Sequence, residues 1–298
     1  MEQSIKLKLS NKKIGVFVIT LIFIGVYFVI KALPDSECGF LHYEKVVNEN
    51  GEIEYCATNS AGFIDLSKLQ YPVQLIMDWD SDSKQGQLSL KLDGGHFLLP
   101  HELAYTHTKK IHLLLVDESL EDYHHLHPDI TELDQTYTFN FNPKTKGVYK
   151  AYAEVVPKRT RRQLIASSEL KVGNDLRVQN FSRKTQDVQG ALRFELLGVP
   201  EVLEVNKDYR FKLTVLDPSG MPAQLERIMD AKAHMVAFDS GRLGFAHMHP
   251  VEEVVDLDSL ENLDFYFNVP KAGWYRLFAQ VQINGASVYG SFDLLVKG

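Results

Sequence analysis

An internal repeat constrains the fold of this chain more than any other feature of its sequence. Residues 100–128 align with residues 222–250 without a gap, and eight positions are identical. The shared pattern is P-x-x-L-x6-K-x-H-x4-D-x7-H-x-H-P, so three histidines recur at the same spacing in each copy. Histidine is an uncommon residue, and this agreement indicates two copies of one ancestral unit. The chain therefore contains two related domains.

Both copies have the sequence pattern of β-structure. Short apolar or alternating runs, separated by turn residues, recur from about residue 60 to the C-terminus. A second shared element, Gly147–Tyr149 and Gly273–Tyr275, opens a strand in each copy. This element resembles the tyrosine corner of immunoglobulin-like sandwiches. We expect an all-β protein with two tandem immunoglobulin-like (cupredoxin-like) β-sandwich domains after one N-terminal transmembrane helix.

The N-terminal segment has the pattern of a membrane anchor. Lysines precede an uncharged apolar run from Ile14 to Ile30, which Lys31 closes. At 17 residues the run is short for a membrane span but longer than the usual core of a signal peptide. No small-residue cleavage site follows it, so we interpret it as an uncleaved signal anchor. The lysines favour a cytoplasmic N-terminus, which places the rest of the chain outside the cytoplasm.

These signals divide the chain into six segments. We predict a cytoplasmic N-terminus (1–13), a transmembrane anchor (14–31), a disulfide-stapled connector (32–59), β-sandwich repeat 1 (60–173), a linker (174–190) and β-sandwich repeat 2 (191–298). The two cysteines, Cys38 and Cys56, lie in the connector. Outside the cytoplasm they are expected to form one disulfide. A thiolate metal site is the alternative, but their spacing matches no zinc motif.

The repeated histidines are expected to share one face of a β-hairpin. With a turn at Ser240-Gly241, His247 lies opposite His234, and His249 lies opposite Lys232. Residues two apart on a strand share a face, so the three histidines project together. The same reasoning applies to the first copy around Glu118-Ser119. Three imidazoles on one face suit zinc or copper. The predicted metal ligands are His112, His125, His127, His234, His247 and His249.

Further ligands differ between the copies. Imidazole combined with thioether favours copper(I) over zinc, although methionines at such positions more often pack in a core. The additional candidates are His107, His124, Met235 and Met248. Copper/zinc superoxide dismutases build related sites on a similar sandwich, but no bridging histidine is found here, so dismutase activity does not follow.

Two other interpretations of the histidines stay open. They could be structural, with imidazoles bonded to buried backbone groups where strands diverge. They could also hold an anion or carboxylate, because Lys110 and Lys232 accompany them and a lysine disfavours a bound dication. A zinc hydrolase would need a general base, for which Glu102 and Glu121 are candidates, but neither has an acidic counterpart in the second copy.

The tandem H-x-H-P pattern resembles that of bacterial envelope proteins, some of which are suspected of handling metals. This resemblance implies a module of the inner membrane with a periplasmic bulk, which binds copper (or zinc) for storage, buffering or delivery without catalysis. The alternative is a structural or interaction protein that docks an envelope partner. The net charge of −7 gives no support for nucleic-acid binding.

Overall fold

The computed structural model describes two compact units, residues 1–37 and residues 38–298. The described residues are 2–32, 45–47, 53–55, 62–106, 108–130, 136–160, 162–175, 177–229, 231–251 and 263–298. In the first unit, side chains are described for residues 14–29. The predicted disulfide partners Cys38 and Cys56 lie outside the described residues, as does His107.

The described part of the first unit is one long helix, α1 (Glu2–Ala32). From Ile14 to Val29 most of its described side chains are apolar and exposed. Among the described residues, however, no helix is both long enough and apolar enough to cross a membrane. The transmembrane part of the predicted anchor at 14–31 is therefore not confirmed.

The first repeat is a sandwich of two four-stranded sheets. One sheet has the order β4 (Val73–Trp79), β5 (Gln85–Leu92), β9 (Tyr137–Asn140) and β8 (Asp129–Ile130). The other has the order β11 (Leu164–Lys171), β10 (Val148–Val155), β6 (Ile111–Val116) and β7 (Tyr123–Leu126). A short 3-10 helix, η1 (Pro100–Glu102), precedes β6. Alternating residues of the two sheets, including Leu90, Phe139, Leu113 and Ala151, form one buried core.

The second repeat has the same plan with a larger inner sheet. Its four-stranded sheet has the order β12 (Gln186–Gln189), β13 (Leu192–Leu197), β15 (Tyr209–Leu216) and β18 (Leu263–Phe267). Its six-stranded sheet has the order β14 (Leu203–Glu204), β20 (Ala286–Lys297), β19 (Gly273–Ile283), β16 (Ala233–Asp239), β17 (Gly244–Met248) and β3 (Phe63–Asp65). In a separate two-stranded sheet, β1 (Lys45–Val47) pairs antiparallel with β2 (Ile53–Tyr55). These findings show the expected tandem β-sandwich architecture.

The edge strand β3 comes from the chain just before the first repeat, yet it pairs with β17 of the second. Gly244 stands opposite Asp65 in this ladder, and a Cβ at Gly244 would collide with the backbone oxygen of Ile64. A glycine at this position therefore allows the two backbones to approach closely. As a result, β3 links the start of one repeat to the sheet of the other.

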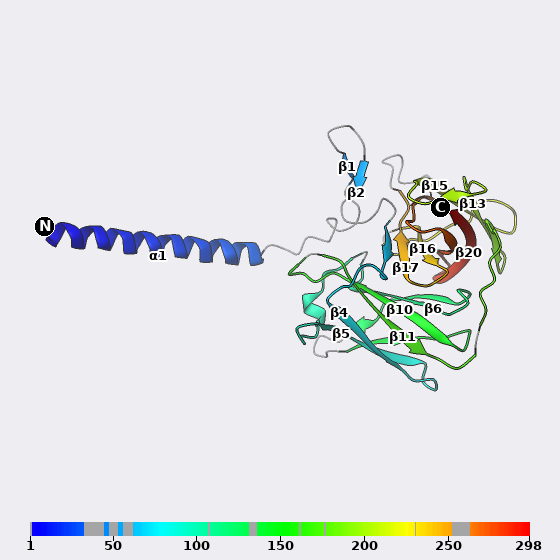
Figure 1. Ribbon diagram of the computed structural model, residues 1–298, viewed down its shortest axis with the longest axis horizontal. Coiled ribbons are helices and arrows are strands. Elements are labelled where there is room, and N and C mark those ends of the chain that lie inside the picture. Colours follow the sequence, from blue (N-terminus) through cyan, green and yellow to red (C-terminus); the bar gives the residue numbers. More distant parts are fainter. Residues whose placement is uncertain are drawn as a thin grey trace. The chain divides into compact units, whose positions relative to one another are not determined.

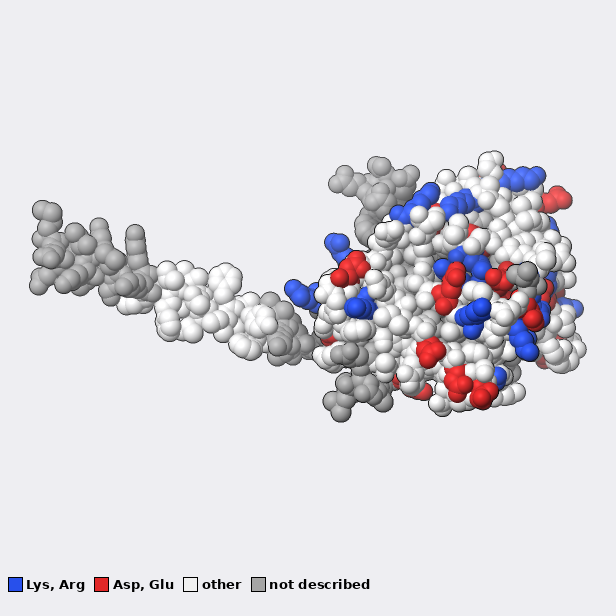
Figure 2. Space-filling model, turned by 60° about the horizontal axis from the view of Figure 1, so that its bottom comes forward, with Lys and Arg blue, Asp and Glu red and all other residues white. Residues whose placement is uncertain are grey.

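The two sandwiches lie side by side (Figure 1). They pack against each other through a third cluster of buried side chains. Leu114, Val116 and Tyr152 of the first repeat contact Val236 and Phe238 of the second in this cluster. Strands β6 and β16 are consequently buried along their whole length, because each has a sandwich core on one face and the partner repeat on the other. The surface visible in Figure 2 carries acidic and basic side chains interspersed, without a field of one sign.

Polar contacts also hold the two repeats together. The side-chain amide of Gln179 donates to the carbonyl of Glu118 at 3.0 Å and to that of Ser240 at 2.7 Å. These two acceptors occupy equivalent positions in the repeated hairpins. Arg276 of the second repeat donates to the carbonyl of Leu120 in the first at 3.1 Å. The relative placement of the sandwiches is thus held by both apolar packing and hydrogen bonds.

The aspartate shared by the two copies closes the hairpin loop. One oxygen of Asp239 accepts the amides of Leu243 and Gly244, each at 2.8 Å. Asp117 accepts the amides of the equivalent residues, Glu121 and Asp122, in the first repeat. Buried carboxylates that accept backbone hydrogen bonds stabilise such loops. The repeated aspartate is therefore a structural residue.

The expected tyrosine corners are present in both repeats. The hydroxyl of Tyr149 reaches the carbonyl of Thr145 at 3.3 Å, and that of Tyr275 donates to the carbonyl of Lys271 at 2.9 Å. Each bond runs back four residues along the chain and holds the entry to a long central strand, as in immunoglobulin-like sandwiches. Burial raises the pKa of both hydroxyls, so they remain protonated donors.

Candidate metal centre

The strand register of the histidine hairpins differs from the sequence-based expectation. Val236, not His234, lies opposite His247 in the ladder between β16 and β17. Leu114 likewise lies opposite His125 between β6 and β7. The predicted pairing is wrong by two residues because the loop between the strands, residues 240–243, is centred on Gly241-Arg242, one residue later than the expected turn. A shift of two preserves the face of each side chain, so the histidines still project from one side.

Each repeat brings its three histidines together. The ligand atoms of His112, His125 and His127 lie within 4.8 Å of one another, and the same limit holds for His234, His247 and His249. We call these two groups the first and second triads. In each triad two rings are buried and the ring of the H-x-H-P end is partly buried. The triads lie on the sheet faces that the two repeats turn toward each other.

The two triads are neighbours across the interface between the repeats. The ring centroids of His125 and His247 are 5.1 Å apart, and those of His112 and His247 are 5.6 Å apart. These separations are close to those within a triad, such as 5.3 Å between His112 and His125. The histidines of both repeats therefore form a single group, which we call the six-histidine cluster.

Hydrogen bonds fix the tautomers of two rings in the first triad. The Nε2 atom of His112 is 2.9 Å from the carbonyl oxygen of Thr106, so it must carry the hydrogen. The Nδ1 atom of His125 is 3.1 Å from the side-chain oxygen of Gln280, whose amide nitrogen donates to Ser287. In the neutral rings, the lone pairs then lie on Nδ1 of His112 and Nε2 of His125. These two atoms face each other at 3.1 Å.

The environment favours the neutral form of two rings of the first triad, His125 and His127. Burial, reinforced by the neighbouring histidines, holds the pKa of His125 well below its ordinary value. Burial and the charge of Lys109 lower the pKa of His127 to about 4. Near neutral pH both rings are therefore uncharged, which is the form that binds metal ions.

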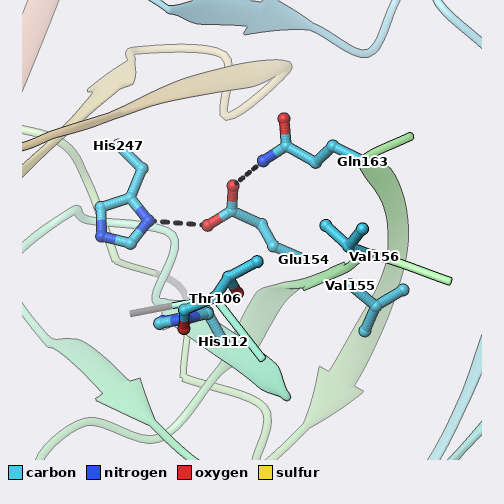
Figure 3. Close-up of a pocket in the computed structure, with 7 residues that line it drawn as sticks. All are labelled: Thr106, His112, Glu154, Val155, Val156, Gln163 and His247. Carbon is cyan, nitrogen blue, oxygen red and sulfur yellow. Dashed lines mark hydrogen bonds and ion pairs between the residues drawn. The ribbon is translucent and has the colours of Figure 1, made fainter. Parts of the chain in front are cut away.

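In the second triad, His247 is oriented by an acidic side chain of the first repeat. Its Nδ1 atom donates to Glu154 at 2.7 Å, and the other carboxylate oxygen of Glu154 accepts the amide of Gln163 at 2.6 Å (Figure 3). These side chains border a small cavity that His112 and Thr106 also line. The Nε2 atoms of His247 and His127 are buried and have no hydrogen-bond partner among the described residues. Such atoms fit metal coordination.

The lysines that accompany the histidines do not occupy the cluster in the way the sequence suggested. The ammonium group of Lys110 donates to the carbonyl of Pro100 at 2.9 Å and lies over the ring of Tyr105. Lys232 is partly exposed. Because the charge of Lys110 is held at a backbone carbonyl, this lysine opposes a bound dication less than the sequence suggested.

The additional candidate ligands lie elsewhere. The side chains of Met235 and Met248 are 0% and 4% exposed in the core of the second sandwich, on the face opposite His234 and His247. His124 pairs with Asp122 at 2.9 Å and packs against Phe141, on the core side of its strand. The structure therefore does not bring these three side chains to the cluster.

Sequence reasoning missed the residues that orient the rings. Glu154 and Gln280 occupy equivalent positions, five residues after the tyrosines of the two corners. They pair with His112 and His234 in the ladders of β10 with β6 and of β19 with β16. An alignment extended from the tyrosine corners would have brought these two polar residues into register.

Comparison with known sequences gives one family. The sequence model described as "Domain of unknown function (DUF8832)" matches twice, at residues 70–172 and 186–298. Together the two matches include both triads and cover more than half of the chain. A search of curated proteins gave no match.

Comparison with solved structures gives tandem immunoglobulin-like and fibronectin-like proteins at low similarity. Three N-terminal domains of the bacteriophage RB49 outer capsid protein Hoc are 12% identical, with 76% of this chain and 59% of that chain covered and a TM-score of 0.19. The fibronectin(III)-like modules of Clostridium thermocellum CbhA are 10% identical, with 74% and 94% covered and a TM-score of 0.21. The D1–D4 ectodomain fragment of ICAM-5 is 14% identical, with 76% and 54% covered and a TM-score of 0.23. This chain thus spans less than two thirds of two of these structures, and TM-scores this low carry no argument about function.

Proposed function

Since the chain belongs to the DUF8832 domain family in two copies, and its repeats bury their histidines against each other, we propose that it binds transition-metal ions at the six-histidine cluster. One observation carries this proposal: the lone pairs of His112 Nδ1 and His125 Nε2 face each other at 3.1 Å. Two lone pairs repel at that distance unless a positive charge lies between them. A metal ion or a shared proton supplies such a charge.

The distance suits a metal ion. Two imidazole nitrogens bound to one zinc or copper ion, with bonds of about 2.0–2.1 Å, lie about 3–3.4 Å apart. The pKa of His125 is lowered mainly by burial, which disfavours a proton on that ring. A metal-bound histidine usually donates its other N–H to a carbonyl or carboxylate. His112, His125 and His247 each have such an acceptor on their second nitrogen.

Nitrogen-only ligands suit copper or zinc. Because Met235 and Met248 pack in the core, the case for a copper(I) site with thioether ligands is weaker than the sequence suggested.

We propose storage, buffering or delivery of the ion without catalysis. The buried carboxylate of Glu154 is already bonded to His247 and Gln163. The partly exposed carboxylate of Glu102 is bonded to His96 and the amide of Leu99, so neither is placed as a general base.

We also propose that α1 tethers the globular unit outside the cytoplasm, at the bacterial inner membrane. The exposed apolar side chains of residues 14–29 and the lysines that precede them support this location. An extracytoplasmic position suits a protein that receives or delivers metal ions.

Metal analysis of the purified full-length chain tests the binding proposal. The chain is stripped with a chelator, incubated with Zn²⁺ or Cu²⁺, desalted and analysed for bound metal. We expect one or two ions per chain, with none retained by the double variant His127→Ala/His249→Ala. A folded wild-type chain that retains no metal would refute the proposal.

A structural role for the histidines is the second candidate, and a specific observation favours it. His125 bonds to Gln280 and His247 bonds to Glu154, so two of the histidines join the repeats directly. The cluster also continues the apolar layer between the sandwiches. Under this alternative the protein is an interaction module of the envelope, it binds no metal, and the double variant loses much of its stability.

A further inference from the structure

The two triads differ in the residue that orients their central ring. His247 of the second triad donates to the carboxylate of Glu154, whereas His125 of the first triad donates to the amide oxygen of Gln280. Glu154 and Gln280 are equivalent in the two repeats, and each orients the histidine of the other repeat. The two triads therefore differ by one charge at this equivalent position.

The charge of Glu154 acts on the second triad with little screening by solvent. Glu154 is 5% exposed, so solvent screens its carboxylate weakly. A carboxylate that accepts the Nδ1 hydrogen raises the electron density on Nε2 and makes the ring a stronger ligand. A cation on Nε2 of His247 would in turn stabilise the buried anion. The neutral amide of Gln280 gives His125 no comparable advantage.

The closeness of the triads adds a second effect. His125 and His247 have ring centroids 5.1 Å apart, and His125 and His234 are 6.3 Å apart. An ion in one triad therefore places a positive charge within several ångströms of the other. Coulomb repulsion at that distance weakens the binding of a second ion.

We infer that the six-histidine cluster is a two-ion centre that fills in order. The first ion binds His234, His247 and His249, and the second binds His112, His125 and His127 more weakly. This inference rests on the proposed metal-binding function. The order is set by the Glu154–Gln280 difference, and the gap between the two affinities is widened by repulsion between the ions.

A Cu²⁺ titration of the full-length chain, followed by calorimetry and electron paramagnetic resonance, tests the order of filling. Two binding steps are expected, and the second ion is expected to broaden the spectrum of the first by dipolar coupling. His249→Ala should remove the tight step, and His127→Ala should remove the weak step. These matched variants alter the same position in each repeat.

A pair of near-isosteric variants tests the cause. Glu154→Gln should weaken the tight step by about 10–100-fold, and Gln280→Glu should tighten the weak step by a similar factor. Equal effects of Glu154→Gln on both steps, a single shared ion, or two equal and uncoupled sites would overturn the inference while leaving metal binding intact. Absence of any Cu²⁺ binding by the folded chain would instead overturn the proposed function, and the inference with it.

Discussion

The Nδ1 atom of His112 faces the Nε2 atom of His125 at 3.1 Å, and the opposite nitrogen of each ring is engaged by an oxygen acceptor. Acceptors supplied by the fold therefore orient two of the proposed metal ligands. The acceptor for His112 lies in its own repeat, whereas that for His125 lies in the other repeat. The geometry of the first triad therefore depends on how the two sandwiches pack.

Metal binding should stabilise the fold, because the ligands converge only in the folded chain. At a free Zn²⁺ concentration of 100 times the dissociation constant, the free energy of unfolding should rise by about 2.7 kcal/mol per site. Thermal unfolding with and without Zn²⁺ measures this change, and addition of a chelator should reverse it. A melting temperature that Zn²⁺ leaves unchanged would speak against binding to the native state.

The metal-free chain should lose stability in mild acid. The pKa of His127 is lowered from 6.5 to about 4 in the folded chain, mainly by burial. The unfolded chain therefore binds more protons in this interval, so the stabilisation is complete above about pH 6.5 and is lost as the pH falls toward 4. His125, whose pKa is also lowered, acts in the same direction.

Urea unfolding of the metal-free chain at several pH values measures this loss. We expect the free energy of unfolding to fall by on the order of 1–3 kcal/mol between pH 7 and pH 5. The variant His127→Asn should show a shallower dependence. An unchanged slope in that variant would show that His127 does not contribute.

The hairpin aspartates should matter for stability rather than for ligand binding. Asp239→Ala removes the acceptor for the amides of Leu243 and Gly244 in a buried loop. We expect a loss of about 1–3 kcal/mol in the free energy of unfolding. Asp217→Ala is the control, because Asp217 closes a similar turn at an exposed position and should have a smaller effect. Equal losses in the two variants would contradict the assigned role.

Strand β3 should detach when Gly244 acquires a side chain. The Cβ in Gly244→Ala would collide with the backbone oxygen of Ile64, so the ladder between β3 and β17 cannot persist unchanged. Hydrogen exchange of the amides of residues 63–65 should become faster, while exchange in β19 and β20 stays slow. Gly94→Ala is the control, because a Cβ there meets nothing nearby. Unchanged protection of β3 would show that the backbones tolerate the methyl group.

The sequence predicted the tandem sandwiches and the shared face of each triad. The face on which a side chain lies depends on whether its position along the strand is odd or even. An error of two residues in the register leaves this unchanged. The register itself could not be predicted, because a buried carboxylate, Asp117 or Asp239, holds each loop one residue later along the chain than the expected turn. Backbone bonds of this kind leave no periodic pattern in the sequence.

The packing of the two sandwiches was not predicted, although a signal for it was present. Apart from His112, His234 and the terminal Asp239, strands β6 and β16 have continuous apolar sequences, which is typical of strands buried on both faces. A sandwich strand that faces solvent on one side alternates instead. This pattern indicates that the histidine-bearing faces are covered, but it does not identify the other repeat as the cover.

The most direct test of the central claim is a crystal structure of the full-length chain grown with Zn²⁺ and measured at the zinc absorption edge. We predict anomalous density about 2.0–2.1 Å from Nε2 of His247, with weaker density between Nδ1 of His112 and Nε2 of His125 at higher Zn²⁺. Well-ordered rings in their present positions without anomalous density at either triad would contradict the account.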